Sequence, residues 1–205
     1  ATAKASGIAL SSAEREIRQR SVDAVVNLAY RLQPFSTPIV LGFAKGSAAD
    51  CDDDVVLRFV ESLSEVMARI SGTGIPIVVE ATNHYESPVA NSTKEAIDII
   101  KKISNEFVSI LPDTYHMNIE DPFLEASLIA AVPYANKVHF SDSNRRFPGL
   151  GTIDFRSALR VLQELRFNGR IGLEGNTNDL ISETALSVEY LNQASRLLQV
   201  AGVDA

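Results

Sequence analysis

The sequence of 205 residues is long enough for one large domain, and 45% of it is hydrophobic, which suffices for a buried core. Nineteen basic residues against 26 acidic ones give a formal net charge of −7, which disfavours binding to the phosphates of nucleic acids. The single cysteine, Cys51, cannot form an internal disulfide, and no apolar run approaches the roughly 18 residues of a membrane span. We therefore expect a soluble, cytoplasmic protein with neither a nucleic-acid nor a membrane partner.

Helical patterns and short apolar runs alternate along the chain. Apolar side chains recur at helical spacing in six segments, the first over residues 17–32 and the last over about 182–198. Capping signals at Ser92, at Asp121-Pro122 and at Asp154 predict the starts of three of these helices. In chain order, the predicted strands are residues 38–43, 75–80, 107–111, 137–140 and 169–174.

Five strands that alternate with six helices indicate an α/β fold with a parallel sheet covered by helices. No linker or low-complexity segment divides the chain, so residues 1–205 are predicted to form a single domain. A closed (β/α)8 TIM barrel has eight strand–helix units in about 250 residues. The pattern therefore leaves two architectures open, which are an open doubly wound sheet and most of a barrel.

Ionisable side chains lie at or near the ends of four consecutive predicted strands. Glu80 ends the second strand, Asp113 follows the third, His139 lies in the fourth and Glu174 ends the fifth. The carboxyl ends of parallel strands share one edge of a sheet, where α/β enzymes keep their active sites. Three carboxylates and one imidazole in that place need a cation, because like charges at close range cost several kcal/mol. An oxygen-rich set with one nitrogen suits one divalent metal ion, Mn²⁺, Mg²⁺ or Co²⁺, better than zinc. A solvated acidic rim is the structural alternative.

Further polar side chains follow the same strands and are typical of a site that binds the hydroxyl groups of a neutral polyol or ketose. They are Asn83, Glu86, His116, Asn118, Asn144 and Arg145. The adjacent Arg146 leaves a phosphorylated substrate open. Residues 148–151, Pro-Gly-Leu-Gly, form a glycine-rich loop without the third glycine of a dinucleotide fingerprint or the lysine of a P-loop, so nucleotide binding is not indicated.

Three long motifs resemble one known family. They are residues 79–86 (VEATNHYE), 113–120 (DTYHMNIE) and 138–145 (VHFSDSNR), followed by the Pro-Gly-Leu-Gly loop and Leu173-Glu174. Together they resemble the sugar isomerase/epimerase family with a xylose-isomerase-like TIM barrel, and within it the ketose 3-epimerases of the D-tagatose and D-psicose type and their keto-sugar-acid relatives. The resemblance extends from about Gly7 to the end of the chain. It implies strands four to eight of the barrel, with strands one to three in a segment upstream of Ala1.

The resemblance also implies an activity and a role for each site residue. Glu80, Asp113, His139 and Glu174 would bind one divalent metal ion, and the two glutamates would remove and return a proton on opposite faces of a ketose or keto-sugar acid, through an enediolate. Three further residues, Glu86, His116 and Arg145, would hold the substrate oxygens. We expect a sugar epimerase that forms a homo-oligomer. Ala81 and His84 replace the proline and arginine that the family usually has there, which leaves the specificity of that loop open.

Other functions remain open on the same residues. An aldose–ketose isomerase or a dehydratase could use the same scaffold, because an enediolate can collapse in different directions. A metal-binding paralogue without catalytic activity is the alternative outside the enzymes. The related abasic-site endonucleases are disfavoured, because a three-zinc site needs more than the three histidines of this chain.

Overall fold

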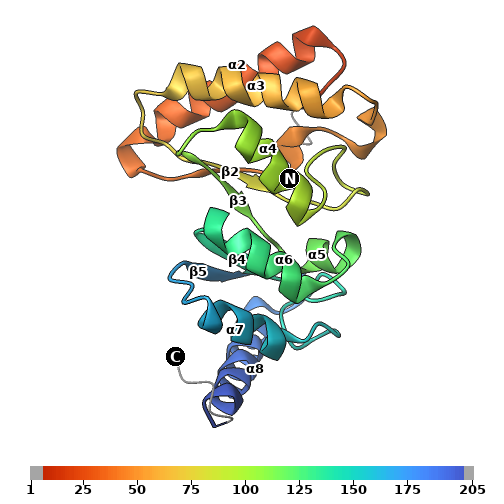
Figure 1. The fold of residues 1–205 in the computed structure, drawn as a ribbon, viewed down its shortest axis with the longest axis vertical. Coiled ribbons are helices and arrows are strands. Elements are labelled where there is room, and N and C mark those ends of the chain that lie inside the picture. Colours follow the sequence, from red (N-terminus) through yellow and green to blue (C-terminus); the bar gives the residue numbers. More distant parts are fainter. Residues whose placement is uncertain (1–6, 201–205) are drawn as a thin grey trace. The chain divides into compact units, whose positions relative to one another are not determined.

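The computed structural model describes residues 7–200 and has seven α-helices and five β-strands in that range (Figure 1). The chain divides between Ile110 and Leu111 into two compact units. Strands and helices alternate along most of the chain, as the sequence predicts, and each predicted strand is found within two residues of its predicted ends. The prediction that residues 1–205 form a single domain stays a prediction.

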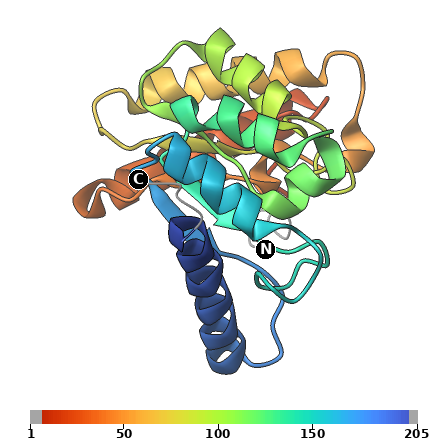
Figure 2. The same cartoon turned by 60° about the horizontal axis from the view of Figure 1, so that its bottom comes forward.

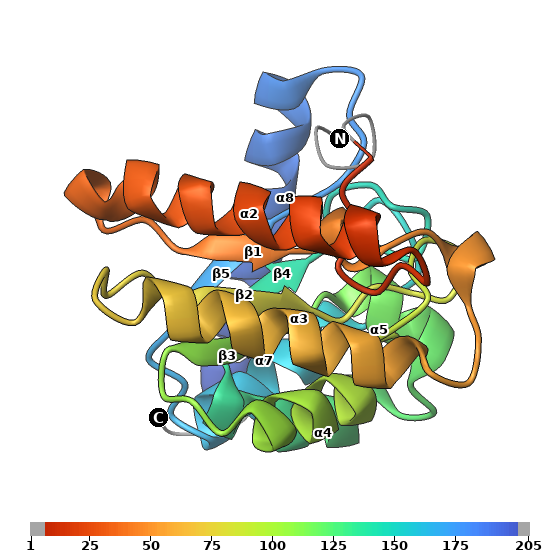
Figure 3. The same ribbon diagram turned by 90° about the horizontal axis from the view of Figure 1, so that it is seen from above.

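The N-terminal unit is built on a sheet with the strand order β1-β2-β3. Strands β1 (Ile39–Leu41) and β2 (Ile77–Glu80) pair in parallel, and all four residues of β2 are buried. Strand β3 (Val108–Leu111) completes the sheet. The helices α2 (Arg15–Leu32), α3 (Val55–Ile70) and α4 (Thr93–Ile103) lie side by side along this sheet (Figure 3).

Local signals in the sequence explain how these helices form. In α3, the apolar residues Phe59, Leu63 and Val66 recur at helical spacing and are completely buried. Of the predicted capping box at the start of α4, the N-cap is confirmed, because the Ser92 side chain accepts a hydrogen bond from the Glu95 backbone N–H. Glu95 in turn accepts a hydrogen bond from the Asn91 backbone N–H at 2.9 Å. These contacts fix the start of α4 just after the loop that follows β2.

The C-terminal unit contains the parallel pair β4 (Lys137–Phe140) and β5 (Arg170–Leu173). Helix α7 (Phe155–Glu164) packs against α6 (Leu124–Ala131) and against the long α8 (Leu180–Val200), which is dark blue in Figure 2. Phe140 and Phe155 pack in the core in a tilted arrangement, with ring centroids 5.0 Å apart. The side chain of Asp154 caps α7 by accepting hydrogen bonds from two backbone N–H groups, as predicted.

The helix between β3 and β4 differs from the prediction. The sequence analysis counted six helices and placed an N-cap at Asp121, but a short additional helix, α5 (Thr114–Glu120), begins directly after Asp113. Asp121 ends α5, because its backbone N–H donates a hydrogen bond to the carbonyl of Met117. The next helix, α6, begins at Leu124 without a side-chain cap. Helix α5 spans only seven residues, too few to display an apolar stripe in the sequence.

Candidate metal centre

Three of the four predicted metal ligands lie on neighbouring segments of the C-terminal unit. Asp113 follows β3, His139 lies in β4 and Glu174 follows β5. The backbone N–H of His139 donates to the carbonyl of Pro112 at 2.9 Å, and Asp113 and His139 form a parallel β-bridge. The backbone N–H of Glu174 donates to the carbonyl of Phe140 at 3.1 Å. Backbone pairing of parallel segments therefore brings these three side chains to one edge.

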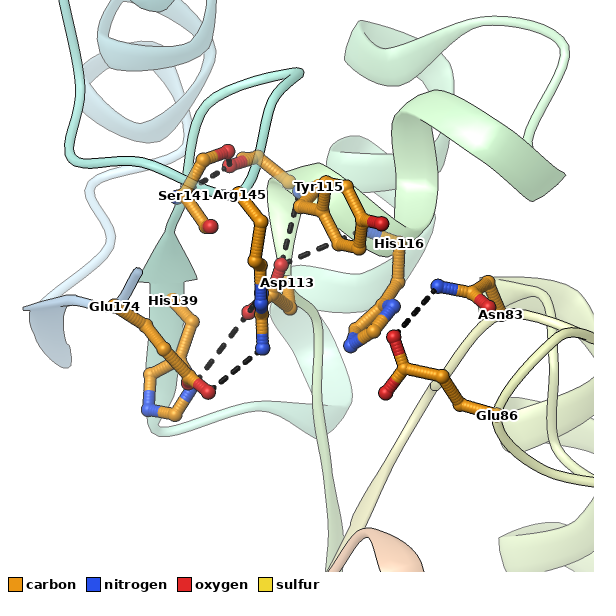
Figure 4. A network of polar contacts seen from close by, with 10 residues as sticks. Asn83, Glu86, Asp113, Tyr115, His116, His139, Ser141, Arg145 and Glu174 are labelled. Atoms are coloured by element: carbon orange, nitrogen blue, oxygen red, sulfur yellow. Dashed lines mark hydrogen bonds and ion pairs between the residues drawn. The ribbon is translucent and has the colours of Figure 1, made fainter. Parts of the chain in front are cut away.

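The side chains themselves converge on one point (Figure 4). One potential ligand atom of each of Asp113, His139 and Glu174 lies within 4.8 Å of those of the other two. His139 Nδ1 contacts Glu174 Oε2 and lies 3.7 Å from Asp113 Oδ2. The Asp113 side chain is completely buried, whereas 36% of the Glu174 side chain is exposed. The cluster is therefore anchored by a buried carboxylate and open to solvent at Glu174.

Arg145 provides the positive charge in this cluster. Its Nη1 donates to Asp113 Oδ2 and its Nη2 donates to Glu174 Oε1, both at 2.7 Å. The guanidinium also lies 4.9 Å from the ring centroid of Tyr115, within the range of a cation–π contact. Burial by itself raises the pKa of Glu174, but the hydrogen bond and charge of His139 and the charge of Arg145 outweigh it. The pKa of Glu174 is therefore below its ordinary value, and the side chain is an ionised carboxylate at neutral pH.

The two oxygens of Asp113 serve different purposes. Oδ1 accepts hydrogen bonds from the backbone N–H groups of Tyr115 at 2.9 Å and His116 at 3.4 Å, and so caps α5. Oδ2 faces His139 and Arg145. The cap orients the first turn of α5, and the His116 side chain in this turn is 1% exposed. Asp113 thus positions His116 and contributes an oxygen to the cluster.

The fourth predicted ligand, Glu80, belongs to the N-terminal unit and ends β2. It is 9% exposed, and its carboxylate lies against Gly42, where an added Cβ would stand 2.5 Å from Glu80 Oε2. The completely buried Lys45 donates hydrogen bonds from Nζ to the carbonyls of Glu80 at 2.6 Å and Ala90 at 3.2 Å. Burial lowers the pKa of Lys45 to about 7. Lys45 therefore links the end of β2 to Ala90 in the loop after this strand.

Glu86 lies on the loop that follows Glu80 in the same unit. Its Oε1 accepts a hydrogen bond from Asn83 Nδ2 at 3.3 Å, and Asn83 is 1% exposed (Figure 4). Asn83 Oδ1 accepts a hydrogen bond from the backbone N–H of Tyr85 at 3.1 Å. Asn83 thus stabilises the loop after β2 and holds the half-buried Glu86 side chain in place.

Some predicted polar residues have structural partners. Asn144 Nδ2 donates to the carbonyl of Leu150 at 2.7 Å, and Arg146 Nη2 donates to Glu183 Oε1 at 2.7 Å. Asn118 is exposed. Arg146 therefore forms an ion pair with Glu183 of α8, which disfavours its binding the phosphate of a substrate.

Two buried charged residues, one in each unit, were not predicted from the sequence. Lys45 lies just beyond the carboxyl end of β1, and its position in a Gly-Phe-Ala-Lys-Gly segment directly after an apolar run was a usable signal. Asp142 lies two residues after β4 and is completely buried. Nothing in the local sequence distinguishes Asp142 from an exposed loop aspartate.

The donor set of the cluster fits a divalent metal ion. Carboxylate oxygens and one imidazole nitrogen are ligands that Mn²⁺, Mg²⁺ and Co²⁺ accept. The Arg145 guanidinium contacts both Asp113 and Glu174, so the cluster already holds one cationic group.

None of the helices in residues 7–200 combines the length and the hydrophobicity that a membrane span requires.

Comparison with known proteins identifies relatives that are sugar epimerases. The D-psicose 3-epimerase of Ruminiclostridium cellulolyticum (strain ATCC 35319 / DSM 5812 / JCM 6584 / H10) is 30% identical over 117 residues, which are 57% of this chain and 40% of that protein. The 3-dehydro-D-guloside 4-epimerase of Escherichia coli (strain K12) is 31% identical over 146 residues, 71% of this chain and 52% of that protein. The matches therefore span about half the length of these curated relatives.

A solved structure and a family model decide the architecture. The crystal structure of D-psicose 3-epimerase with D-tagatose from Clostridium cellulolyticum H10 superposes with a TM-score of 0.78 and 22% identity, and covers 92% of this chain and 75% of that chain. This likeness favours the barrel over the open doubly wound sheet, and the five strands form part of such a barrel. Residues 2–194 match the family model described as "Xylose isomerase-like TIM barrel". The chain therefore belongs to the xylose isomerase-like TIM barrel family.

Proposed function

We propose that this protein is a divalent-metal-dependent epimerase that acts on a ketose or a keto-sugar acid. The observation that carries the proposal is the convergence of Asp113, His139 and Glu174 at the ends of neighbouring parallel segments. The names of the relatives, D-psicose 3-epimerase and 3-dehydro-D-guloside 4-epimerase, support the reaction class. The matches span only about half of these relatives, so the activity of the whole protein is a proposal.

Glu80 is proposed to complete the ligand set of one metal ion. It occupies the carboxyl end of β2, as Asp113 and Glu174 occupy the ends of β3 and β5. We infer Mn²⁺ as the ion, with Mg²⁺ or Co²⁺ as alternatives, because the donors are mainly carboxylate oxygens. When bound, such an ion polarises a ketone and makes the hydrogen on the adjacent carbon more acidic.

The two glutamates are proposed to move the proton. Glu174 suits the role of base, because its lowered pKa keeps the carboxylate ionised and its side chain is partly open to a ligand. Glu80 would act from the opposite face of the sugar, returning a proton to the carbon. Removal on one face and return on the other inverts the configuration at that carbon, which is an epimerisation.

Three further side chains are proposed to orient the substrate. Arg145 is held in place by two carboxylates and can present its remaining N–H groups to oxygens near the carbonyl. His116 is fixed by the capped first turn of α5, and Glu86 by its contact with Asn83. Fixed donors and acceptors of this kind lower the entropic cost of reaching the reactive geometry. The pairing of Arg146 with Glu183 favours an unphosphorylated sugar.

The proposal is tested with purified protein that is treated with a chelator and then reloaded with Mn²⁺, Mg²⁺ or Co²⁺. The protein is incubated in deuterated water with D-fructose, D-psicose, D-tagatose and a set of keto-sugar acids, and NMR follows both products and deuterium incorporation. We expect deuterium at the inverted carbon of one substrate. An aldose product would establish the isomerase instead, and loss of water from the sugar would establish a dehydratase. Metal binding without exchange into any substrate would establish a non-catalytic paralogue.

Cytoplasmic location and homo-oligomeric assembly stay predictions. Light scattering after size exclusion measures the assembly state, and a monomeric mass would contradict the second prediction.

A further inference from the structure

The Pro148–Gly151 segment has no role in the proposed chemistry, although a glycine-rich loop at an active site usually binds an anion through its backbone N–H groups. Here the group that accepts from the backbone N–H groups of the loop is a carboxylate of the same chain, Asp142. We propose that the carboxylate of Asp142 occupies this loop and is the positioning residue for Arg145. The functional part of this inference rests on the proposed role of Arg145 as a substrate-binding residue.

The Asp142 side chain accepts four backbone hydrogen bonds while completely buried. Oδ1 accepts from the N–H groups of Ser143 at 2.8 Å and Ile153 at 3.0 Å. Oδ2 accepts from the N–H groups of Gly149 at 2.9 Å and Gly151 at 2.8 Å. A buried carboxylate is costly unless its lone pairs are used, and four donors use them. The carboxylate therefore ties Gly149 and Gly151 of the loop to the second residue after β4.

The two glycines are required by this close approach. Gly149 has φ +89°, a conformation that residues with a side chain rarely adopt. At Gly151, an added Cβ would stand 2.3 Å from Asp142 Oδ1. The glycine-rich sequence is thus explained by a carboxylate of the same chain, with no phosphate needed.

Arg145 lies on the turn that Asp142 begins. The backbone N–H of Arg145 donates to the carbonyl of Asp142 at 2.9 Å, and the backbone N–H of Asp142 donates to the carbonyl of Arg146 at 2.8 Å. Arg145 itself has φ 58°, in the left-handed region, which costs free energy unless the surroundings enforce it. The Asp142 carboxylate binds the backbone N–H groups of residues 149, 151 and 153, which follow this turn. Its hydrogen bonds therefore help to impose the conformation that aims the guanidinium at Asp113 and Glu174.

Helix α8 supports the same loop from its other side. Ser187 Oγ donates to the carbonyl of Pro148 at 2.8 Å, and an added Cβ on Gly149 would stand 2.9 Å from the Tyr190 ring. Because these contacts do not involve Asp142, we expect its substitution to loosen the loop and leave the fold in place.

The first test replaces Asp142 by asparagine and measures amide hydrogen exchange by NMR. Asparagine keeps the shape, but its NH₂ group faces two of the four backbone donors whichever way the amide is turned. Those two N–H groups lose a hydrogen bond to a charged acceptor, so their exchange rates should rise by about 10- to 100-fold. Asp154→Asn is the matched control, because it makes the same change at an exposed helix cap and should leave Gly149 and Gly151 protected. Unchanged protection of residues 143, 149, 151 and 153 in Asp142→Asn would overturn the inference.

The second test asks whether Asp142 acts through Arg145. Urea unfolding midpoints are compared for Asp142→Asn, Arg145→Ala and the double variant. If Asp142 positions Arg145, the loss on adding Arg145→Ala is smaller in the Asp142→Asn background than in the wild type. Asp154→Asn combined with Arg145→Ala should show simple additivity. Additive effects of Asp142→Asn and Arg145→Ala would overturn the positioning role.

Kinetics provide the functional readout on whichever ketose the wild type turns over. Asp142→Asn should raise KM and leave kcat closer to the wild-type value, and it should have no further effect on KM in the Arg145→Ala background. A further rise in KM in that background would contradict positioning through Arg145. If the wild type turns over no ketose or keto-acid, the proposed function fails, while hydrogen exchange and unfolding still decide whether Asp142 organises the loop and positions Arg145.

Discussion

Replacing Glu174 by glutamine separates the role of this residue as a base from its role as a ligand. The carboxylate uses Oε1 for Arg145 and Oε2 for His139, so one carbonyl oxygen can keep only one of these contacts. An amide does not accept a proton at neutral pH. Loss of a positioned base typically lowers turnover by about 10²- to 10⁴-fold, and we expect a loss in this range. Metal affinity should fall much less, because the amide carbonyl remains a ligand beside Asp113 and His139.

Two measurements on the same samples distinguish these effects. Calorimetric titration gives the affinity for Mn²⁺, and NMR in deuterated water at saturating Mn²⁺ gives the rates of exchange and epimerisation. Glu125→Gln is the matched control, because Glu125 Oε2 pairs with Arg160 at 2.9 Å on the helices α6 and α7, away from the cluster. This control removes one carboxylate and one arginine contact without touching the site.

The outcome that refutes the reasoning is turnover by Glu174→Gln at the wild-type rate with saturating metal. A loss of turnover in Glu125→Gln as large as that in Glu174→Gln would also refute it, because the effect would then reflect a general loss of charge. A parallel collapse of metal affinity and turnover in Glu174→Gln would reduce the role of Glu174 to that of a ligand.

Three further predictions concern the N-terminal unit. Gly42→Ala should displace the Glu80 carboxylate and lower the affinity for Mn²⁺ in calorimetric titration, with little change in the urea midpoint, whereas Gly72→Ala should change neither, because an added Cβ there meets nothing within 4 Å. Lys45 has a folded pKa of about 7, below its unfolded value, so the unfolded state binds more protons between these two pKa values and stability rises with pH there. Relative to Lys45→Met, the wild type should therefore gain up to about 1.4 kcal/mol of unfolding free energy per pH unit from pH 7 to 9, and a flat difference would contradict this. Ser92→Ala removes the N-cap of α4 and should cost about 1 kcal/mol in urea unfolding, and an unchanged midpoint would show that the cap contributes nothing.

The strands and most of the helices could be predicted because their signals are local. The strand Ile77–Glu80 is short, buried along its whole length and apolar up to Glu80, so its conformation and burial follow from the same few residues. The side chains that end such runs fall at one sheet edge by the geometry of parallel strands, which is why Asp113, His139 and Glu174 could be grouped before any coordinates.

The features that the sequence analysis missed depend on contacts that no local pattern records. Helix α5 is fixed by its cap at Asp113, whose sequence context indicates a metal ligand and not a helix cap. The burial of Asp142 depends on donors as far along the chain as Ile153, and Arg145 is oriented by carboxylates that follow other strands. Buried Lys45 donates to the carbonyls of Glu80, the last residue of β2, and Ala90, which lies in the loop after β2.

The guanidinium of Arg145 lies between two carboxylates, which bears on whether the protein would need a metal ion in order to fold. Many small metal-binding domains cannot fold until the ion arrives, because nothing else compensates their ligands. Here the Arg145 guanidinium contacts both Asp113 and Glu174, so the acidic edge of the C-terminal unit has a counter-charge from its own chain. Because its pKa lies below the ordinary value, Glu174 would need no deprotonation when an ion binds. Under the proposed function, the ion would be needed for turnover and not for neutralising these carboxylates during folding.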